Sequence, residues 1–223
     1  MNRCGEGFLI KKKLLSDSLM FVKILSSESQ VLTSCCKINK KNQLILEVGN
    51  YFKFEKFARE GRLGVVQMEL IKGYGGSCVM MGKVKLDYFV NVMSILDRVL
   101  QYEGQEVPGV FVEVMSLMRQ VVTSSDQDFK AICLLAIKNI LKNCGYGFQL
   151  EECVVTQSKN IDDLIFISPK SWSAVSSKAA IGYENKLLKL PKFFITNTLD
   201  ASVECIECGS KIVDKFVQKV LMA

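Results

Sequence analysis

The chain has 223 residues with 29 Lys or Arg, 23 Asp or Glu and no histidine, which gives a formal net charge of +6. This length can hold one large or two small domains. Although 49% of the residues are hydrophobic, no run approaches the roughly 18 consecutive apolar residues of a membrane span, and the first residues lack a signal-peptide pattern. We therefore expect a cytoplasmic protein that does not interact with a membrane.

The missing histidine limits the chemistry that is open to the chain. Histidine is the commonest general base and a usual zinc ligand, so ordinary hydrolytic catalysis is not expected. The nine cysteines are odd in number and scattered, which is typical of thiols in a reducing compartment and not of a disulfide framework.

The positive charge is concentrated in the first third of the chain. Residues 1–82 contain 13 Lys or Arg against 7 Asp or Glu, whereas residues 83–223 contain 16 of each. A concentrated positive surface attracts polyanions and supplies phosphate contacts that do not depend on base sequence, so nucleic acid is the leading partner class. A solvated, lysine-rich face without a ligand is the alternative from composition alone.

Up to about residue 72 the chain shows short runs of strand-forming residues separated by polar segments. Five such short strands suit a small barrel of the OB-fold type, in which loops beside the groove contact nucleic acid. The predicted strands are Gly7–Leu15, Ser18–Leu25, Gln30–Cys36, Gln43–Phe57 and Gly64–Ile71.

Lysines and arginines gather in two connections of this barrel and on its fourth strand, where Lys53 and Lys56 alternate with aromatic residues. Cations neutralise backbone phosphates, while most of the rings are expected to pack the barrel core. We place DNA contact first on Lys37, Lys40 and Lys41, and then on Lys53, Lys56, Arg59 and Arg62.

The glycine-rich segment Lys72–Ser77 predicts a boundary, because its glycines are too dense for the interior of a helix or a strand. Apolar residues then recur at helical spacing in three segments, 86–100, 111–122 and 129–141. Asp126 is suited to cap the third helix, and Gly145 to end it in a left-handed turn.

After these helices, Leu164–Ile167 and Trp172–Ser176 predict a β-hairpin around Pro169–Ser171. A last helix is expected from about Thr198 to Val220, with Val203 among its buried residues. The predicted fold is α+β: an OB-fold over residues 1–76 and a mainly helical domain over residues 77–223, with the hairpin near residues 164–176.

No cofactor, metal or catalytic site is expected. Cys205 and Cys208 are spaced like half of a zinc ribbon, but the chain has no second pair of this kind. The segment before Gly82-Lys83 lacks the first glycine of a phosphate-binding loop. Adjacent carboxylates such as Asp162 and Asp163 do not converge on one reacting atom, so a nuclease site is weakly indicated.

Three patterns in the second half of the chain occur together in a family. They are Cys144–Leu150 with Cys153, then Leu164–Ser171 running into Ala174–Ser176, and then Leu187–Pro191. In this order they resemble RecO, the bacterial recombination mediator, in its alphaproteobacterial forms. Two segments of the first domain, Glu6–Ile10 and Val48–Asn50, extend the resemblance over most of the chain.

The resemblance implies an OB-fold followed by a helical domain, and a protein that is not an enzyme. RecO proteins bind single- and double-stranded DNA, anneal strands coated by single-stranded DNA-binding protein, recognise the acidic C-terminal tail of that protein, and work with RecR to load RecA. These are the partners that the resemblance predicts for this chain.

This chain departs from the family pattern in four places. Ser34–Lys37 replaces an arginine-rich segment, and Trp172-Ser173 replaces Gly-Arg in the hairpin. Thr156 stands where zinc-binding relatives have cysteine, so a complete zinc site is not expected. In the helix that helps to bind the acidic tail, Lys138 or Lys142 would have to supply the cation.

Two other classes of function remain open at this point. The protein could be an interaction scaffold that holds its partners through the helical domain and binds DNA weakly or not at all. It could also be a metal-dependent nuclease or a zinc enzyme, although the missing ligands argue against this class.

Overall fold

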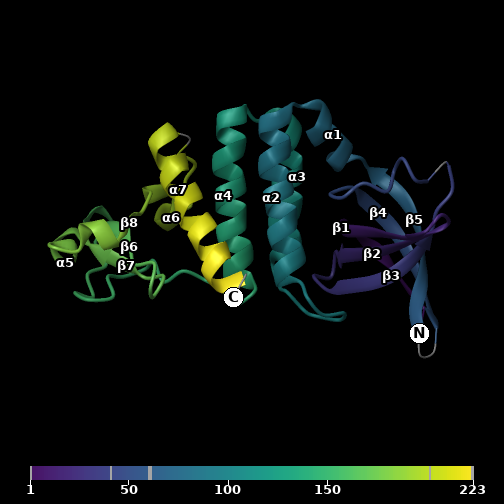
Figure 1. The fold of residues 1–223 in the computed structure, drawn as a ribbon, viewed down its shortest axis with the longest axis horizontal. Helices are drawn as coiled ribbons and strands as arrows, with labels where there is room; N and C mark the ends of the chain where they lie inside the picture. Colours follow the sequence, from purple (N-terminus) through teal and green to yellow (C-terminus); the bar gives the residue numbers. More distant parts are fainter. Residues whose placement is uncertain (1, 41, 60–61, 201, 222–223) are drawn as a thin grey trace. The chain divides into compact units, whose positions relative to one another are not determined.

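The computed structural model describes residues 2–40, 42–59, 62–200 and 202–221. Its first part is a closed barrel with the strand order β1-β2-β3-β5-β4, drawn in purple and blue in Figure 1. Neighbouring strands are antiparallel except for the parallel pair of β3 and β5. The strands are β1 (Arg3–Ser16), β2 (Leu19–Ser26), β3 (Val31–Lys37), β4 (Tyr51–Arg59) and β5 (Arg62–Lys72). The predicted five-stranded OB-fold barrel is confirmed.

The barrel closes because apolar residues alternate along its strands and point to one side. On β2, Met20, Val22 and Ile24 belong to the buried cluster inside the barrel. On β4, Phe52 and Phe54 point into the same cluster, while Lys53 between them is exposed. The expectation that most rings of the fourth strand pack the core is therefore confirmed for these two.

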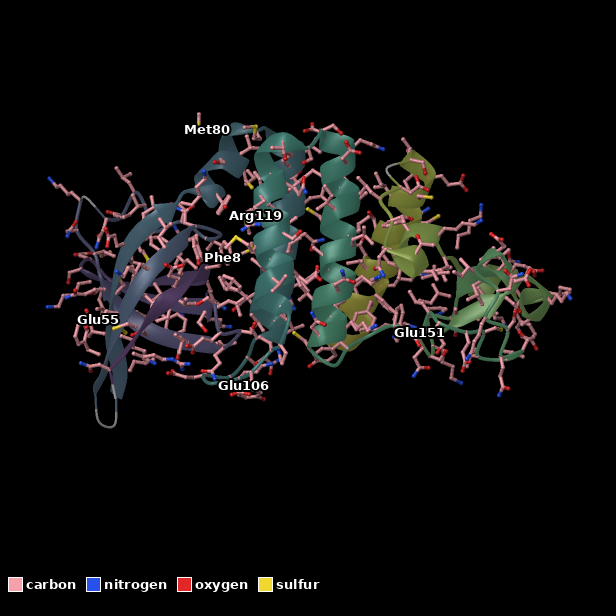
Figure 2. The ribbon with its side chains drawn as sticks, turned by 180° about the vertical axis from the view of Figure 1, so that it is seen from behind. Phe8, Glu55, Met80, Glu106, Arg119 and Glu151 are labelled. Carbon is pink, nitrogen blue, oxygen red and sulfur yellow. The ribbon has the colours of Figure 1, made fainter. Side chains whose placement is uncertain are left out.

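Three helices pack against the outside of the barrel: α1 (Tyr74–Met80), α2 (Lys83–Val99) and α3 (Val110–Thr123). Figure 2 shows Phe8 on the side of the barrel that faces the helices, and Glu55 on the opposite side. The ring of Phe8 lies 5.4 Å from the ring of Phe111 in α3, centroid to centroid. Gly49 has a positive φ of 86°, and a side chain there would come within 2.3 Å of Phe89 in α2. The Val48–Asn50 segment thus makes room for a helix side chain.

The chain forms two compact units, Met1–Thr123 and Ser124–Ala223. The barrel ends at Lys72 and helices α1, α2 and α3 belong to the first unit. The compact units thus group three helices with the barrel. The division into a DNA-binding domain over residues 1–76 and a helical domain from residue 77 stays a prediction.

In the second unit, α4 (Asp126–Asn143) packs against α7 (Val203–Phe216), and the two lie side by side in Figure 1. A small sheet has the strand order β7-β6-β8. Its strands are β6 (Leu164–Ile167), β7 (Ala174–Ser176) and β8 (Leu188–Lys189). The remaining elements are η1 (Ile161–Asp163), α5 (Ser177–Ala180), η2 (Glu184–Lys186), α6 (Lys192–Thr196) and the π-helical turn η3 (Val217–Leu221).

The structure corrects two predictions in the first unit. The fourth strand begins at Tyr51, not at Gln43, because residues 42–45 form a turn, after which the backbone N–H groups of Ile45 and Leu46 both donate to the Asn42 carbonyl at 3.1 Å. The glycine-rich boundary is partly helical, since α1 begins at Tyr74. Gly75 is needed there because a side chain would come within 2.1 Å of the Val48 carbonyl oxygen.

The second unit also differs in detail from the expectations. The cap of α4 is Ser125, whose hydroxyl accepts from the Asp128 N–H at 3.1 Å, and not Asp126. The last helix starts at Val203, which is 63% exposed, so its predicted burial is wrong. Gly145 has a φ of 85° after α4, as predicted.

The predicted hairpin is present as β6 and β7, and β8 joins it as a third strand. Sequence reasoning missed β8 because two residues carry too short a pattern. Within the described ranges, no helix combines the length and the apolar character that crossing a membrane requires.

Candidate nucleic-acid interface

The connection after β3 presents lysines at one end of the barrel. Lys37 ends β3 and Lys40 follows it, and both are exposed. The Asn39 N–H donates to Asn42 Oδ1 at 2.7 Å, and the Asn42 N–H donates to Asn39 Oδ1 at 3.0 Å. These two reciprocal bonds fix the turn and leave the lysine side chains in solvent. Lys41, the third predicted contact, lies outside the described residues.

The register of the barrel adds Lys13 and Phe21 to this end, and sequence reasoning missed both. Phe21 lies between Met20 and Val22, which point inward, so its ring is on the outer face. Lys13 is directly opposite Phe21 on β1, and Lys37 is two residues beyond Cys35, the partner of Phe21 on β3. Opposite and diagonal neighbours share a face and lie about 5 and 7–8 Å apart. A half-buried ring is thus flanked by two exposed cations.

We call Lys13, Phe21, Lys37 and Lys40 the lysine–phenylalanine face. Among the residues that the structure describes, no carboxylate forms an ion pair with its three lysines. The alternation of inward-pointing residues along β2 would have been enough to predict that Phe21 lies on the outer face of the barrel. A β-bulge between Leu9 and Lys11 shifts the alternation of β1, so the position of Lys13 needed the tertiary register.

The predicted arginines lie toward the other end of the barrel. Val65 on β5 pairs with Cys35 on the parallel strand β3, and Arg62 precedes Val65 by three residues. Arg62 is therefore about five residues, or roughly 16 Å, from the level of Lys37 along the strands. Arg59 pairs with Arg62 across β4 and β5, and only the backbone of these two arginines is described. The backbone of these two arginines thus lies away from the level of Lys37.

Lys53 is exposed on β4 between two acidic neighbours. It pairs in register with Glu6 on β1 and with Glu69 on β5. Residues directly opposite each other on adjacent strands share a face, so these carboxylates offset its charge. Lys53 is a weaker candidate for phosphate contact than Lys37.

Lys56 is held by a carboxylate from outside the barrel. Its side chain is only 14% exposed, and its ammonium donates to Glu103 in the segment between α2 and α3. The Thr33 hydroxyl on β3 donates to the other carboxylate oxygen of Glu103. Burial alone would raise the pKa of Glu103, but the hydrogen bonds from Lys56 and Thr33 outweigh it and hold the pKa below its usual range. The Glu103 carboxylate is therefore ionised at neutral pH.

The lysines that face α2 have a structural role. Lys11 and Lys23 both donate to the carboxylate of Asp97 near the end of α2. Lys12 forms an ion pair with Glu47 at 2.7 Å. Of the three consecutive lysines on β1, only Lys13 has no acidic partner among the described residues, so the net charge overstates the positive surface that is open to DNA.

The two lysines predicted to receive an acidic tail differ in their surroundings. Lys138 on α4 is 7% exposed, and its ammonium donates to the Phe194 carbonyl at 2.9 Å and to the Asn197 side chain at the end of α6. Lys142, one turn further along α4, is exposed and lies 4.0 Å from Glu151. A cavity of about 120 Å³ lies beside them, lined by Phe148 and other residues. Of these two lysines, only Lys142 presents its charge to solvent at this cavity.

The cysteines do not form a metal centre within the described ranges, where no group of three or more Cys, Asp or Glu side chains is arranged to hold an ion. Burial raises the pKa of the Cys205 and Cys208 thiols. For Cys153, burial alone would raise the thiol pKa, but hydrogen bonds from Ser176 and Thr156 outweigh this effect. The net result is a pKa lowered to about 6. Thr156 thus supports the Cys153 sulfur by a hydrogen bond from its backbone N–H at 3.4 Å.

A family model described as "Recombination protein O C terminal" matches residues 84–221, which is more than half of the chain. The chain belongs to the RecO family. The resemblance that the sequence motifs indicated is confirmed, and RecO relatives extend it into the barrel.

Relatives from several bacteria carry the name "DNA repair protein RecO". The relative from Orientia tsutsugamushi (strain Ikeda) is 28% identical over 203 residues, which are 90% of this chain and 82% of the relative. The relative from Rickettsia typhi is 30% identical over 206 residues, with coverage of 92% and 84%. The relative from Rickettsia felis is 28% identical over 227 residues, with coverage of 99% and 91%.

Proposed function

We propose that this protein is a recombination mediator in DNA repair. It binds single- and double-stranded DNA, anneals strands coated by single-stranded DNA-binding protein, and with RecR helps to load RecA. Membership of the RecO family and the names of the relatives support the role in DNA repair. The activity requires binding alone, so we propose a cytoplasmic, nucleoid-associated protein that is not an enzyme and needs no cofactor.

The observation that carries DNA binding is the lysine–phenylalanine face. A lysine without an acidic partner that contacts a phosphate releases condensed counterions, so affinity arises without base recognition and falls as salt rises. An aromatic ring can stack on a base for about 1–3 kcal/mol whatever the base is. Phe21 between Lys13 and Lys37 provides both kinds of contact on one outer surface of the barrel.

Annealing follows from the same contacts. Two single strands repel each other through their phosphates, and lysines that neutralise part of this charge reduce the repulsion when both strands are bound. Contacts to the backbone leave the base-pairing edges open. The energy of base pairing then drives the reaction, and the protein lowers the electrostatic cost of bringing the strands together.

Recognition of the acidic tail is proposed for the exposed Lys142 and the adjacent small cavity. An acidic peptide would pair with the Lys142 ammonium, while Phe148 and Leu150 line the apolar part of the cavity. Lys138 would act indirectly there, because its ammonium already holds the end of α6. Lys142→Ala should weaken binding of a tail peptide in fluorescence anisotropy.

The decisive test measures binding of a labelled single-stranded oligonucleotide at several salt concentrations. Replacing Lys37 and Lys40 by alanine should reduce the slope of log affinity against log salt by about 1.4, or 0.7 for each lost phosphate contact. Phe21→Ala should weaken binding by about 1–3 kcal/mol at every salt concentration. Lys83→Ala removes one exposed positive charge at the start of α2 and serves as the matched control.

Unchanged binding by the Lys37/Lys40 and Phe21 variants would refute the assignment of this surface. Annealing of complementary strands that are coated by single-stranded DNA-binding protein, with and without its acidic tail, then tests the mediator function. Loss of annealing when the tail is removed supports tail recognition.

An interaction scaffold with weak DNA binding is a second candidate. It is favoured by the ion pairs that occupy Lys11, Lys12 and Lys56 within the chain. Capture of RecR or of single-stranded DNA-binding protein, together with the absence of measurable DNA affinity at low salt, would support this function over the first.

A further inference from the structure

The segment between α2 and α3 runs beside the turn that precedes β3 and is fixed there through its backbone. The Val31 N–H donates to the Gln105 carbonyl at 3.0 Å, and the Gly104 N–H donates to the Val31 carbonyl at 2.8 Å. The Val107 N–H donates to the Ser29 carbonyl at 2.8 Å. The segment therefore extends the hydrogen bonding of the barrel by a short length of chain, and its side chains have fixed starting points.

The side chain of Glu103 projects from this segment onto two donors of the barrel. One carboxylate oxygen accepts from the Lys56 ammonium and the other from the Thr33 hydroxyl. The donors come from β4 and β3, which are separated in the barrel by β5. An ammonium and a hydroxyl that converge on two oxygens of one anion are also the donors that proteins use to hold a phosphate.

We propose that Lys56 and Thr33 form a phosphate-binding position on the barrel, and that the Glu103 carboxylate occupies this position until a nucleic-acid backbone displaces it. The ligand class is the phosphodiester of a nucleic-acid strand. This inference rests on the proposed function, because it names how part of the DNA-binding surface is regulated.

The exchange needs little movement. The Glu103 side chain is 44% exposed whereas that of Lys56 is 14% exposed, so the carboxylate is the partner that can turn into solvent. The flanking backbone bonds do not involve this side chain and can persist. Rotation of one side chain then opens the position, and the Lys56 ammonium keeps an anionic partner before and after the exchange.

Competition with the Glu103 carboxylate also predicts which ligands can bind to Lys56 and Thr33. A carboxylate tethered beside its site has an effective concentration in the millimolar range, so a free phosphate at lower concentration does not displace it. A strand that is already held by the lysine–phenylalanine face gains the same advantage of tethering. Lys56 should therefore be engaged by strands long enough to reach from the lysine–phenylalanine face to the Glu103 carboxylate, and short oligonucleotides should leave Glu103 in place.

The test compares Glu103→Gln with Glu106→Gln in the full chain. Each change removes one negative charge from the same segment, but Glu106 accepts from the neutral amide of Gln30 at 3.0 Å and not from a lysine. For a long single strand, Glu103→Gln should tighten binding about threefold to fivefold, the upper part of the range expected when one partly exposed ion pair no longer competes. The salt slope should rise by about 0.7, equivalent to one added phosphate contact.

Glu106→Gln should stay within about twofold of the wild type, since it changes only the general charge. In a background of Lys56→Ala, the gain from Glu103→Gln should disappear, because the two residues act as a coupled pair. Urea denaturation of each variant checks that the fold is retained.

The outcomes separate the two proposals. If the wild type binds DNA and Glu103→Gln binds equally well, or if Glu106→Gln has the same effect, the phosphate position is refuted while the proposed function stands. If only Glu103→Gln binds, the inference is supported and the wild type is a closed form. If neither protein binds a long strand at low salt, both proposals are wrong.

Discussion

Lys23 should be the lysine whose loss most destabilises the first unit. It lies on β2 with a side chain that is 9% exposed, and its ammonium donates to the Leu100 carbonyl at 2.8 Å and to the Asp97 carbonyl at 3.1 Å. It also donates to the Asp97 carboxylate. These acceptors lie at the C-terminal end of α2, where carbonyl groups have no partner inside the helix and the helix dipole favours a cation.

Lys23→Met keeps most of the apolar side chain and removes all three hydrogen bonds. Breaking a buried ion pair by removing one partner costs about 3–5 kcal/mol. The Asp97 side chain is 23% exposed and retains Lys11, so water and this lysine compensate part of the loss. The expected loss of unfolding free energy is therefore about 2–3 kcal/mol, which lowers the melting temperature by roughly 5–12 °C.

Urea denaturation followed by circular dichroism measures this loss. Lys13→Met is the matched control, because it removes an exposed lysine of the same barrel that has no acidic partner among the described residues. The control should change stability by less than about 0.5 kcal/mol. A Lys23→Met variant that unfolds at the same urea concentration as the wild type would show that the hydrogen bonds from Lys23 to the end of α2 do not contribute to stability.

The ion pairs of Asp97 with Lys11 and Lys23 predict that the stability of the first unit depends on pH. Burial alone would raise the pKa of Asp97, but the hydrogen bonds from Lys11 and Lys23 outweigh it and lower the pKa. A carboxylate whose pKa is lower in the folded state contributes stability at pH values above its unfolded pKa, and this contribution is lost as pH falls through the folded pKa. Stability of the wild type should fall in this acidic range, and Asp97→Asn should make the fall smaller.

Substitutions at Gly49 and Trp172 test two backbone positions. Gly49→Ala should cost about 2–4 kcal/mol in urea denaturation, because it combines a positive φ with a clash against Phe89. Gly145→Ala, at a φ of 85° and with open space around it, should cost only the backbone strain of about 1 kcal/mol, and equal costs would refute the packing role of Gly49. Trp172 has a φ of 57°, in the left-handed region that favours glycine, and packs its ring 4.9 Å from that of Phe216. Trp172→Ala should therefore be less stable than Trp172→Gly by about 1 kcal/mol, and the opposite order in thermal unfolding would contradict this explanation.

Local patterns in the sequence predicted most elements of the fold. Alternating apolar residues indicated the strands, and helical spacing indicated α2, α3, α4 and α7. The glycine-rich boundary is a place where a long-range contact overrides the local pattern. Gly75 can lie in a helix because it packs against the Val48 carbonyl, and nothing within the Lys72–Ser77 segment reveals that partner.

The candidate site was predictable only in part. The exposed positions of Lys37 and Lys40 follow from a polar connection between two strands, and the sequence shows it directly. Phe21 and Lys13 become neighbours of Lys37 only through the pairing of three strands. A β-bulge changes which face a residue occupies, so this grouping depends on the register and not on the spacing along one strand.

The sequence by itself determined the family, the basic barrel and the helical segments, because motif order, charge and periodicity are properties of the linear chain. Only the tertiary structure decided the role of each lysine. Lys37 lies in solvent, whereas the ammonium groups of Lys23, Lys56 and Lys138 are held by acceptors 47 to 77 residues away. The charge of a lysine is fixed by its chemistry, but its availability to a ligand depends on the partners that folding brings next to it.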